Sequence, residues 1–193
     1  AAATGGPDAA GYRFVDSAEV GLSYSFENIS GTGTATASSN DDFLETVAMG
    51  FGFNYYGTSY TNCGICSNGF LSFNDLSSQF TDVPIPNAAV PNNMIAGWWD
   101  DLHPGQAGDI YYQTLGSAPN RRFIVQFQAV QERGVPANLN TFQFKLFEGT
   151  NLIEIHYQSV AGGADTSTIG IENADGSDGL QLFNAAATTF PTP

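Results

Sequence analysis

The second half of the chain alternates apolar and polar residues with a period of two. In RFIVQFQAV, which begins at Arg122, the aromatic and branched residues fall on one face and the glutamines on the other. TFQFKLFE, which begins at Thr141, repeats the pattern. Such alternation is typical of antiparallel strands with one buried face. It predicts six strands, over residues 109–114, 122–130, 141–148, 152–158, 167–172 and 179–183.

The first half contains shorter apolar stretches. Residues 12–26 alternate loosely and predict two strands, and residues 43–53 and 70–73 predict two more. The run MIAGWW from Met94 is too short for a helix and predicts a buried strand, with Asp100 and Asp101 marking its exit into solvent. With 13% aromatic residues and 22 glycines, the chain is predicted to be all-β, with essentially no helix. The expected fold is an antiparallel β-sandwich, jelly-roll-like, of about ten strands.

The organisation along the chain is that of one domain. The 193 residues can bury one core, and we expect a single β-sandwich domain over residues 12–184 between tails at 1–11 and 185–193. Residues 28–42 are small and polar, which predicts a loop or an edge strand. Residues 74–93 contain three prolines and predict a long surface connection. Asn68-Gly69, between these two stretches, predicts a turn or a bulge.

The charge balance excludes some partners. Five basic against 19 acidic residues give a net charge of −14, which argues against binding to nucleic acid. No stretch approaches the roughly 20 apolar residues of a membrane span, so no membrane insertion is expected. The small, polar start AAATGGPDAAGY is typical of a mature N-terminus after a signal peptide. These features predict a secreted protein, extracellular or on a cell surface.

Cys63 and Cys66 have a CxxC spacing. The same spacing serves redox enzymes, half of a zinc site or a small disulfide loop. No second pair of ligands completes a zinc site, and a redox motif needs a following helix, where this chain has Ser67-Asn68-Gly69 and a strand. We therefore predict a structural disulfide between Cys63 and Cys66.

A series of weak motifs occurs in a characteristic order. These are FGFNYYGTSY, SNGFLSF, a Pro-rich loop, MIAGWWDDLHPGQAGDIYY, RRFIVQFQAV, TFQFKLFEGTNLIEIHY and STIGIENADG, within residues 47–180. Together they resemble the nidogen-like (NIDO) extracellular β-sandwich domain and related modules of secreted bacterial surface proteins. The resemblance implies a non-catalytic binding or structural module of extracellular matrix or cell-surface proteins.

Acidic residues gather at predicted strand ends and turns. Oxygen-rich loops suit Ca²⁺, and the alternative is that these acids only form turns and keep the chain soluble. The wider set also contains Asp41, Asp42 and Glu172. The predicted calcium ligands are Asp100, Asp101, Asp109, Asp175 and Asp178.

Other side-chain patterns are sparse. Asn28-Ile29-Ser30 matches the acceptor pattern for N-glycosylation at Asn28. His156 and Glu154 lie on the polar side of their strand and predict an exposed, solvated pair. No motif of a known catalytic constellation is present, so we do not expect an enzyme.

The function expected from these features is that of a secreted, non-catalytic structural or adhesive protein. We expect it to self-assemble into an extracellular filament by β-strand addition, with Tyr12, Phe14 and Val15 as the donor strand. Glycans or extracellular matrix proteins are further candidate partners. The alternatives are a secreted enzyme and a carbohydrate-binding module of a secreted hydrolase. The latter requires exposed tyrosines on a flat face, and its candidates are Tyr55, Tyr56, Tyr111 and Tyr112.

Overall fold

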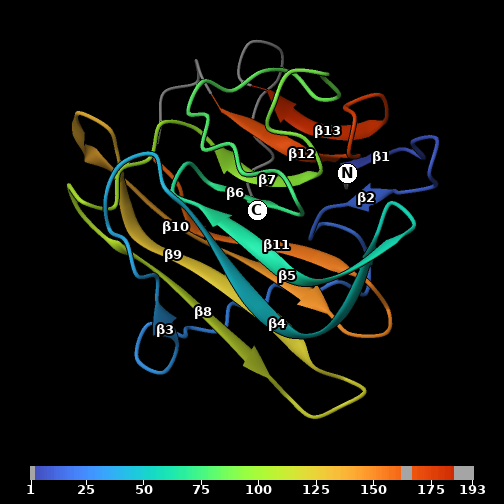
Figure 1. Ribbon diagram of the computed structural model, residues 1–193. Helices are drawn as coiled ribbons and strands as arrows, with labels where there is room; N and C mark the ends of the chain where they lie inside the picture. The colour runs from blue at the N-terminus through green and yellow to red at the C-terminus, as the bar shows by residue number, and fades with distance from the viewer. Residues whose placement is uncertain (1–2, 162–166, 185–193) are drawn as a thin grey trace.

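The computed structural model describes residues 3–161 and 167–184, and these residues contain strands but no helix (Figure 1). All strand pairs are antiparallel, and they form two large sheets and one small one. The six-stranded sheet has the order β13-β12-β7-β6-β5-β4, and the five-stranded sheet has the order β11-β10-β9-β8-β3. The strands are β1 (Thr4–Gly5), β2 (Phe14–Val15), β3 (Thr34–Ala35), β4 (Leu44–Tyr55), β5 (Thr58–Cys66), β6 (Phe70–Ser72), β7 (Met94–Trp99), β8 (Asp109–Leu115), β9 (Arg122–Glu132), β10 (Val135–Phe147), β11 (Ile153–Ser159), β12 (Thr168–Glu172) and β13 (Gly179–Asn184).

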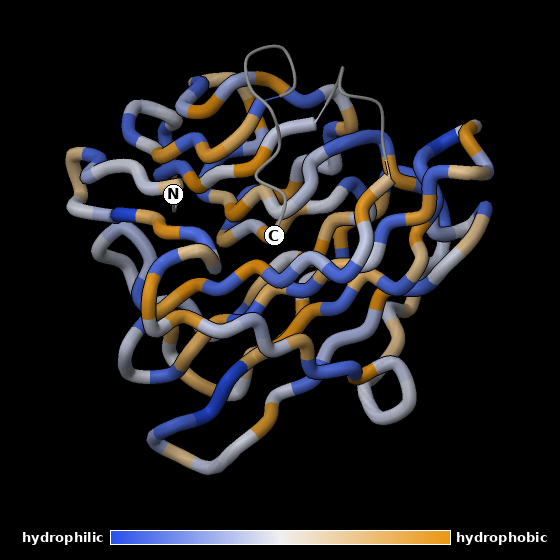
Figure 2. Tube along the Cα trace, turned by 180° about the vertical axis from the view of Figure 1, so that it is seen from behind, coloured by the Kyte–Doolittle hydropathy of each residue, from blue (hydrophilic) through white to orange (hydrophobic). Residues whose placement is uncertain are grey.

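The main hydrophobic core lies between the two large sheets. Alternate residues of β4, from Val47 to Tyr55, are buried and the residues between them are exposed. Facing them, Phe123, Val125 and Phe127 of β9 are fully buried. Figure 2 shows apolar and polar residues alternating along the strands. The predicted all-β sandwich is confirmed, because each sheet turns its apolar face to the other.

The six strands predicted in the second half are all present, as is the connection without strands between β6 and β7. The strand predicted over residues 22–26 is wrong, because this segment is extended but pairs with no strand in the described part of the chain. Instead, residues 24–30 run across the outer face of the five-stranded sheet. Here the backbone N–H groups of Glu27 and Ile29 donate to the side-chain oxygens of Gln143 and Gln126, at 2.9 and 2.7 Å. Side-chain amides of the sheet therefore hold this segment, whereas a paired strand would be held by backbone hydrogen bonds.

This covering segment buries residues that the alternation assigns to solvent. Gln126 is fully buried, and Lys145 is only 2% exposed. The ammonium group of Lys145 donates to Glu27 Oε1 at 2.9 Å, and the guanidinium of Arg122 also pairs with Glu27. The bonds from Arg122, with the charge of Lys145, lower the pKa of Glu27 to about 2. Between this segment and the sheet lies a second, polar interior, in which Lys145 and Arg122 both pair with Glu27.

Strand β7 is buried on both faces. Ile95 and Trp98 belong to the main core, whereas Met94, Ala96 and Trp99 pack in a second cluster on the other side of the sheet with Ile85 of the Pro-rich connection. The N–H groups of Gly97 and Trp98 both donate to the carbonyl of Gly69, at 3.0 and 3.1 Å, so β7 contains a bulge. Adjacent residues of a strand point to opposite faces, and the bulge shifts this alternation by one residue, so that Trp98 faces the main core with Ile95 and Trp99 faces the second cluster with Ala96.

The Asn68-Gly69 turn joins β5 to β6 and is confirmed as predicted. Gly69 has a φ of +81°, and a Cβ atom at this position would lie 1.8 Å from the carbonyl oxygen of Trp98. Buried Asn68 donates to Asp42 Oδ1 at 2.8 Å and to the carbonyl of Ser78 at 3.0 Å. It also accepts from the N–H of Leu102 at 3.1 Å. One turn thus holds three separate loops together.

The predicted disulfide is wrong. Cys63 and Cys66 are both free and buried, and they lie three positions apart on β5, so their side chains point to opposite faces of the sheet. Cys63 packs in the main core and Cys66 in the second cluster. Burial raises the pKa of both thiols, that of Cys66 to about 12. The CxxC spacing predicts a small loop, but both cysteines lie in one strand.

The predicted donor strand is engaged within its own chain. Phe14 and Val15 pair with Gly5 and Thr4 to form the small sheet. Tyr12 packs its ring against Tyr55 and Tyr56, with centroids 6.0 and 4.6 Å apart. None of the three predicted residues pairs with an edge of either large sheet among the described residues. Residues 1–2 and the predicted C-terminal tail, 185–193, lie outside the described residues.

Glu172, at the end of β12, carries a buried carboxyl group. It is 1% exposed, and its Oε2 accepts from the N–H of Asn87 at 3.0 Å. Burial, with the charge of Asp75, raises its pKa from 4.5 to about 7. The carboxyl group therefore holds a proton in the folded protein at pH values where the unfolded chain has released it.

Replacement of Gly69 tests the turn. Gly69→Ala adds the strain of a positive φ, roughly 1–2 kcal/mol, and a backbone clash that adds roughly 1–3 kcal/mol. Gly57→Ala is the matched control, because Gly57 has a φ of +79° and nothing within 4 Å of the added Cβ. Urea unfolding should show a clearly larger loss for Gly69→Ala. Equal losses would mean that the close approach to Trp98 is unimportant.

Thiol titration tests the state of the cysteines. Without reductant, the denatured chain should react at two thiols. The native chain should react slowly, because both thiols are buried and protonated. Absence of reactive thiols after denaturation would contradict the two free cysteines.

The pH dependence of stability tests Glu172. Since unfolding releases its proton, the contribution of Glu172 to the free energy of unfolding is full below pH 4.5 and is lost as the pH rises to about 7. The loss is on the order of 1–3 kcal/mol. In chemical unfolding, Glu172→Gln should flatten this part of the profile relative to the unmodified chain. The same slope in both proteins would contradict the raised pKa of Glu172.

Candidate functional site

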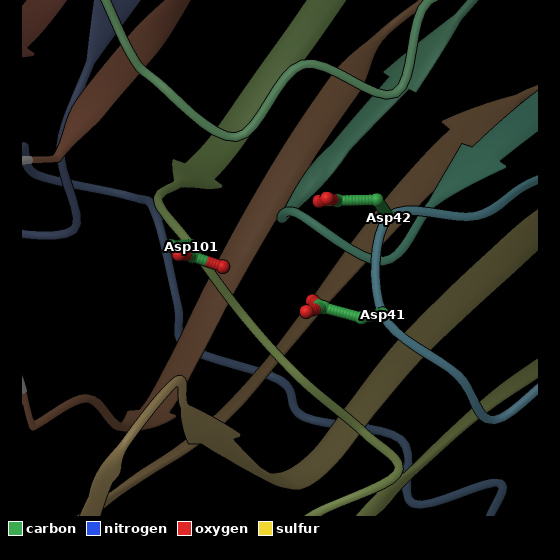
Figure 3. Close-up of side chains that lie close together, drawn as sticks. All are labelled: Asp41, Asp42 and Asp101. Atoms are coloured by element: carbon green, nitrogen blue, oxygen red, sulfur yellow. The ribbon is translucent and has the colours of Figure 1, made fainter.

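Three carboxylates converge at one rim of the sandwich. Asp41 and Asp42 lie in the loop before β4, and Asp101 lies just after β7. Figure 3 shows the two side chains of the loop pointing toward Asp101. One carboxylate oxygen of each residue lies within 4.8 Å of those of the other two. Asn68 fixes this arrangement, because it bonds to Asp42 and to the backbone on either side of Asp101.

Basic groups only partly neutralise this acidic cluster. The guanidinium of Arg133, from the β9–β10 turn, lies 2.9 Å from Asp41 Oδ2 and 3.6 Å from Asp101 Oδ2. His103 Nε2 lies 3.9 Å from the same oxygen of Asp41. Burial, together with the charge of Asp41, raises the pKa of Asp101. Arg133 therefore pairs with two of the three carboxylates, and Asp42 instead accepts from the side-chain amide of Asn68.

Two oxygens of the cluster lack a hydrogen-bond partner. Among the described residues, Asp41 Oδ1 and Asp101 Oδ1 are buried atoms without one, as is His103 Nδ1 beside them. Buried carboxylate oxygens without donors are energetically unfavourable. A hard divalent cation bound here would supply the missing interaction, since carboxylate oxygens are its usual ligands. Asp41, Asp42 and Asp101 are thus the residues that could hold a metal ion.

Of the five predicted calcium ligands, the structure places only Asp101 in this cluster. Asp100 is 5% exposed and does not mark an exit into solvent; its Oδ1 accepts from the N–H of Asp101. Asp109 is exposed at the start of β8 beside Tyr111. Asp175 and Asp178 lie in the β12–β13 turn, where Asp175 accepts from Ser177. Asp101 meets Asp41 and Asp42 through a contact between loops far apart in sequence. No local sequence pattern reveals such a contact.

A cleft of about 490 Å³ lies beside the N-terminal residues. Its lining includes Ala9, Ala10, Tyr56, Tyr60 and Asp178. Both carboxylate oxygens of Asp178 accept backbone N–H groups, from Ala9 at 2.9 Å and from Ala10 at 2.8 Å. Asp178 therefore holds the N-terminal residues and does not face an open cation site.

The tyrosines required for a carbohydrate platform do not share a face. Tyr55 is fully buried and its hydroxyl lies 2.5 Å from the carbonyl of Met94. Tyr111 and Tyr112 are adjacent on β8 and point to opposite sides of the sheet, with Tyr112 packed on the main core. Together with Tyr56 they form no flat aromatic surface.

The remaining predicted positions have local structural roles. His156 and Glu154 do form a pair, with Nε2 and Oε2 2.8 Å apart. However, His156 is buried, because Tyr24 of the covering segment lies on it. Asn28 is exposed, and its side-chain oxygen accepts from the N–H of Ser30 at 3.0 Å. Its glycosylation stays a prediction.

No helix long and apolar enough to cross a membrane occurs within the described residues. No solved structure matches the chain significantly. Alpha-tectorin of Mus musculus is 27% identical over 158 residues, which cover 78% of this chain and 7% of that protein. Alpha-tectorin of Homo sapiens is 31% identical over 80 residues, which cover 42% of this chain and 4% of that protein. The chain thus corresponds to less than a tenth of either relative.

The family described as NIDO related matches residues 12–192, nearly the whole chain. This match agrees with the two-sheet fold and with the order of motifs in the sequence. NIDO domains are extracellular, so the predicted location outside the cell is confirmed. The chain belongs to the NIDO-related family of extracellular β-sandwich domains.

Proposed function

We propose that this domain is a non-catalytic structural module of an extracellular matrix or cell surface, and that Asp41, Asp42 and Asp101 bind Ca²⁺. Similarity to alpha-tectorin supports a matrix-type structural role. The observation that carries the proposal is the convergence of three carboxylates, two of which have buried oxygens without donors. Calcium would connect the loop before β4 to the end of β7 and so act as the cross-link that the free cysteines do not provide.

The charge of the chain supports the same role. A net charge of −14 attracts divalent cations and keeps an extracellular domain soluble. The cluster concentrates part of this charge where one arginine is the nearest counter-charge. A cation bound there would relieve repulsion among the carboxylates, and Arg133 would compete with it for Asp41 and Asp101.

Self-association is the second part of the proposal. A structural module acts through contacts between copies or with other matrix components, and its interfaces need not contain catalytic groups. The partners that we propose are other copies of the domain.

Thermal unfolding with chelator or with Ca²⁺ tests the cation site. An ion that binds only the native state at 100 times its Kd adds about 2.7 kcal/mol, which should raise Tm by roughly 5–10 °C. Asp41→Asn and Asp101→Asn should abolish most of this rise. Asp109→Asn is the matched control, because it removes one exposed carboxylate outside the cluster, and it should keep the rise.

Arg133→Gln extends the same measurement. It removes the competing cation, so the Kd for Ca²⁺ from calorimetry should become smaller. A Tm that is equal in chelator and in millimolar Ca²⁺ would contradict the site. A rise that survives both cluster variants would place the ion elsewhere.

A further inference from the structure

The N-terminal residues 3–16 form a compact unit, which we call the arm. Its two ends are joined by the β1–β2 pairs and by the N–H of Ala3, which donates to Asp16 Oδ2 at 2.9 Å. Its loop is closed by Asp8, whose Oδ1 accepts from the N–H of Tyr12 at 2.7 Å. Because these bonds lie within the arm, it can move without losing its own structure.

The arm is held to the rest of the domain by a small set of contacts. Among the described residues, its hydrogen bonds to the body involve only Tyr56 and Asp178. The hydroxyl of Tyr56 donates to Asp8 Oδ2 at 2.7 Å, and its N–H donates to the hydroxyl of Tyr12 at 3.1 Å. Asp178 accepts from the arm backbone as described above. Figure 1 shows β1 and β2 beside the β4–β5 and β12–β13 turns that carry these two residues.

An exposed linker connects the arm to the covering segment. Residues 17–23 are all exposed, and Val20 is 95% exposed. Among the described residues, their hydrogen bonds are those of local turns, from Ala18 and Glu19 to Asp16 and from Leu22 to Glu19. After the linker, Glu27 and Ile29 are fixed to the five-stranded sheet. The linker is therefore a hinge between two anchored units.

We propose that the arm is exchanged between copies, so that the arm of one chain binds the Tyr56–Asp178 surface of the next. This inference rests on the proposed self-association and names its contact. An exchanged arm makes the same hydrogen bonds and ring contacts as a folded-back arm, and only the linker changes conformation. Exchange is for this reason a low-cost route to association. The partner is a second copy of this chain.

The linker geometry allows the exchange. Seven extended residues span up to about 25 Å, which is enough to cross from one domain to a neighbour. Because the arm and the surface that receives it are different groups, two chains can exchange arms reciprocally in a closed dimer, or each chain can pass its arm to the next in an open chain of copies. In dilute solution the folded-back arm is favoured over exchange, because a chain's own arm has an effective concentration in the millimolar range. Polymers should therefore form only at high concentration.

Complementation between two full-length variants tests the exchange. Asp8→Ala/Tyr12→Ala weakens the arm, and Tyr56→Phe/Asp178→Ala weakens the receiving surface. In analytical ultracentrifugation, the unmodified chain should form dimers or larger oligomers as its concentration rises, and each variant alone should stay monomeric. An equal mixture should form a one-to-one dimer, because only one competent arm and one competent surface remain.

A change in linker length gives an independent test. Deletion of residues 18–20 shortens the linker by about 10 Å, so folding back becomes strained and oligomers should form at a lower concentration. An insertion of three Gly or Ser residues should have the opposite effect.

Two results would overturn the exchange. If the unmodified chain and both double variants assemble equally, self-association stands but the arm does not mediate it. If neither the unmodified chain nor the shortened one assembles at any soluble concentration, the proposed self-association fails together with this inference.

Discussion

The close contact between the Asn68-Gly69 turn and β7 is the constraint on which much of the structure depends. Gly69 approaches Trp98 so closely that only a residue without Cβ fits, and its carbonyl accepts the two N–H groups that define the bulge. The bulge in turn sends Trp98 into the main core and Trp99 to the opposite face of the sheet. Since Asn68 bonds to Asp42, the same turn also sets the geometry of the acidic cluster.

The sandwich is covered on both outer faces, and each cover uses a different interaction. The Pro-rich connection places Ile85 on the six-stranded sheet in an apolar cluster. The segment 24–30 covers the five-stranded sheet through polar side chains, with Glu27 paired to Lys145 and Arg122. Buried charges are tolerated there because each is paired. Among the described residues, the buried carboxylate oxygens that lack a hydrogen-bond partner belong to Asp41 and Asp101, at the rim of the sandwich.

This division of the molecule fits a module that works through association. The two sheets and their covers enclose the two buried clusters, so they form the body of the domain. The acidic cluster and the N-terminal arm lie at the ends of strands and in turns, where residues can change without loss of the core. Membership of the NIDO-related family agrees with this arrangement, because the fold alone does not require a catalytic site.

The sequence by itself determined the fold class and most of the strands. Period-two alternation reports directly on which backbone segments have one buried face, and β8 to β13 follow it. Tertiary structure decided the rest. Cys63 and Cys66 were separated by the pleat of a single strand, and Lys145 was buried by a segment more than a hundred residues away in the chain. The cluster of Asp41, Asp42 and Asp101 likewise forms only when one turn brings two distant loops together, because spacing in sequence carries no information about such contacts.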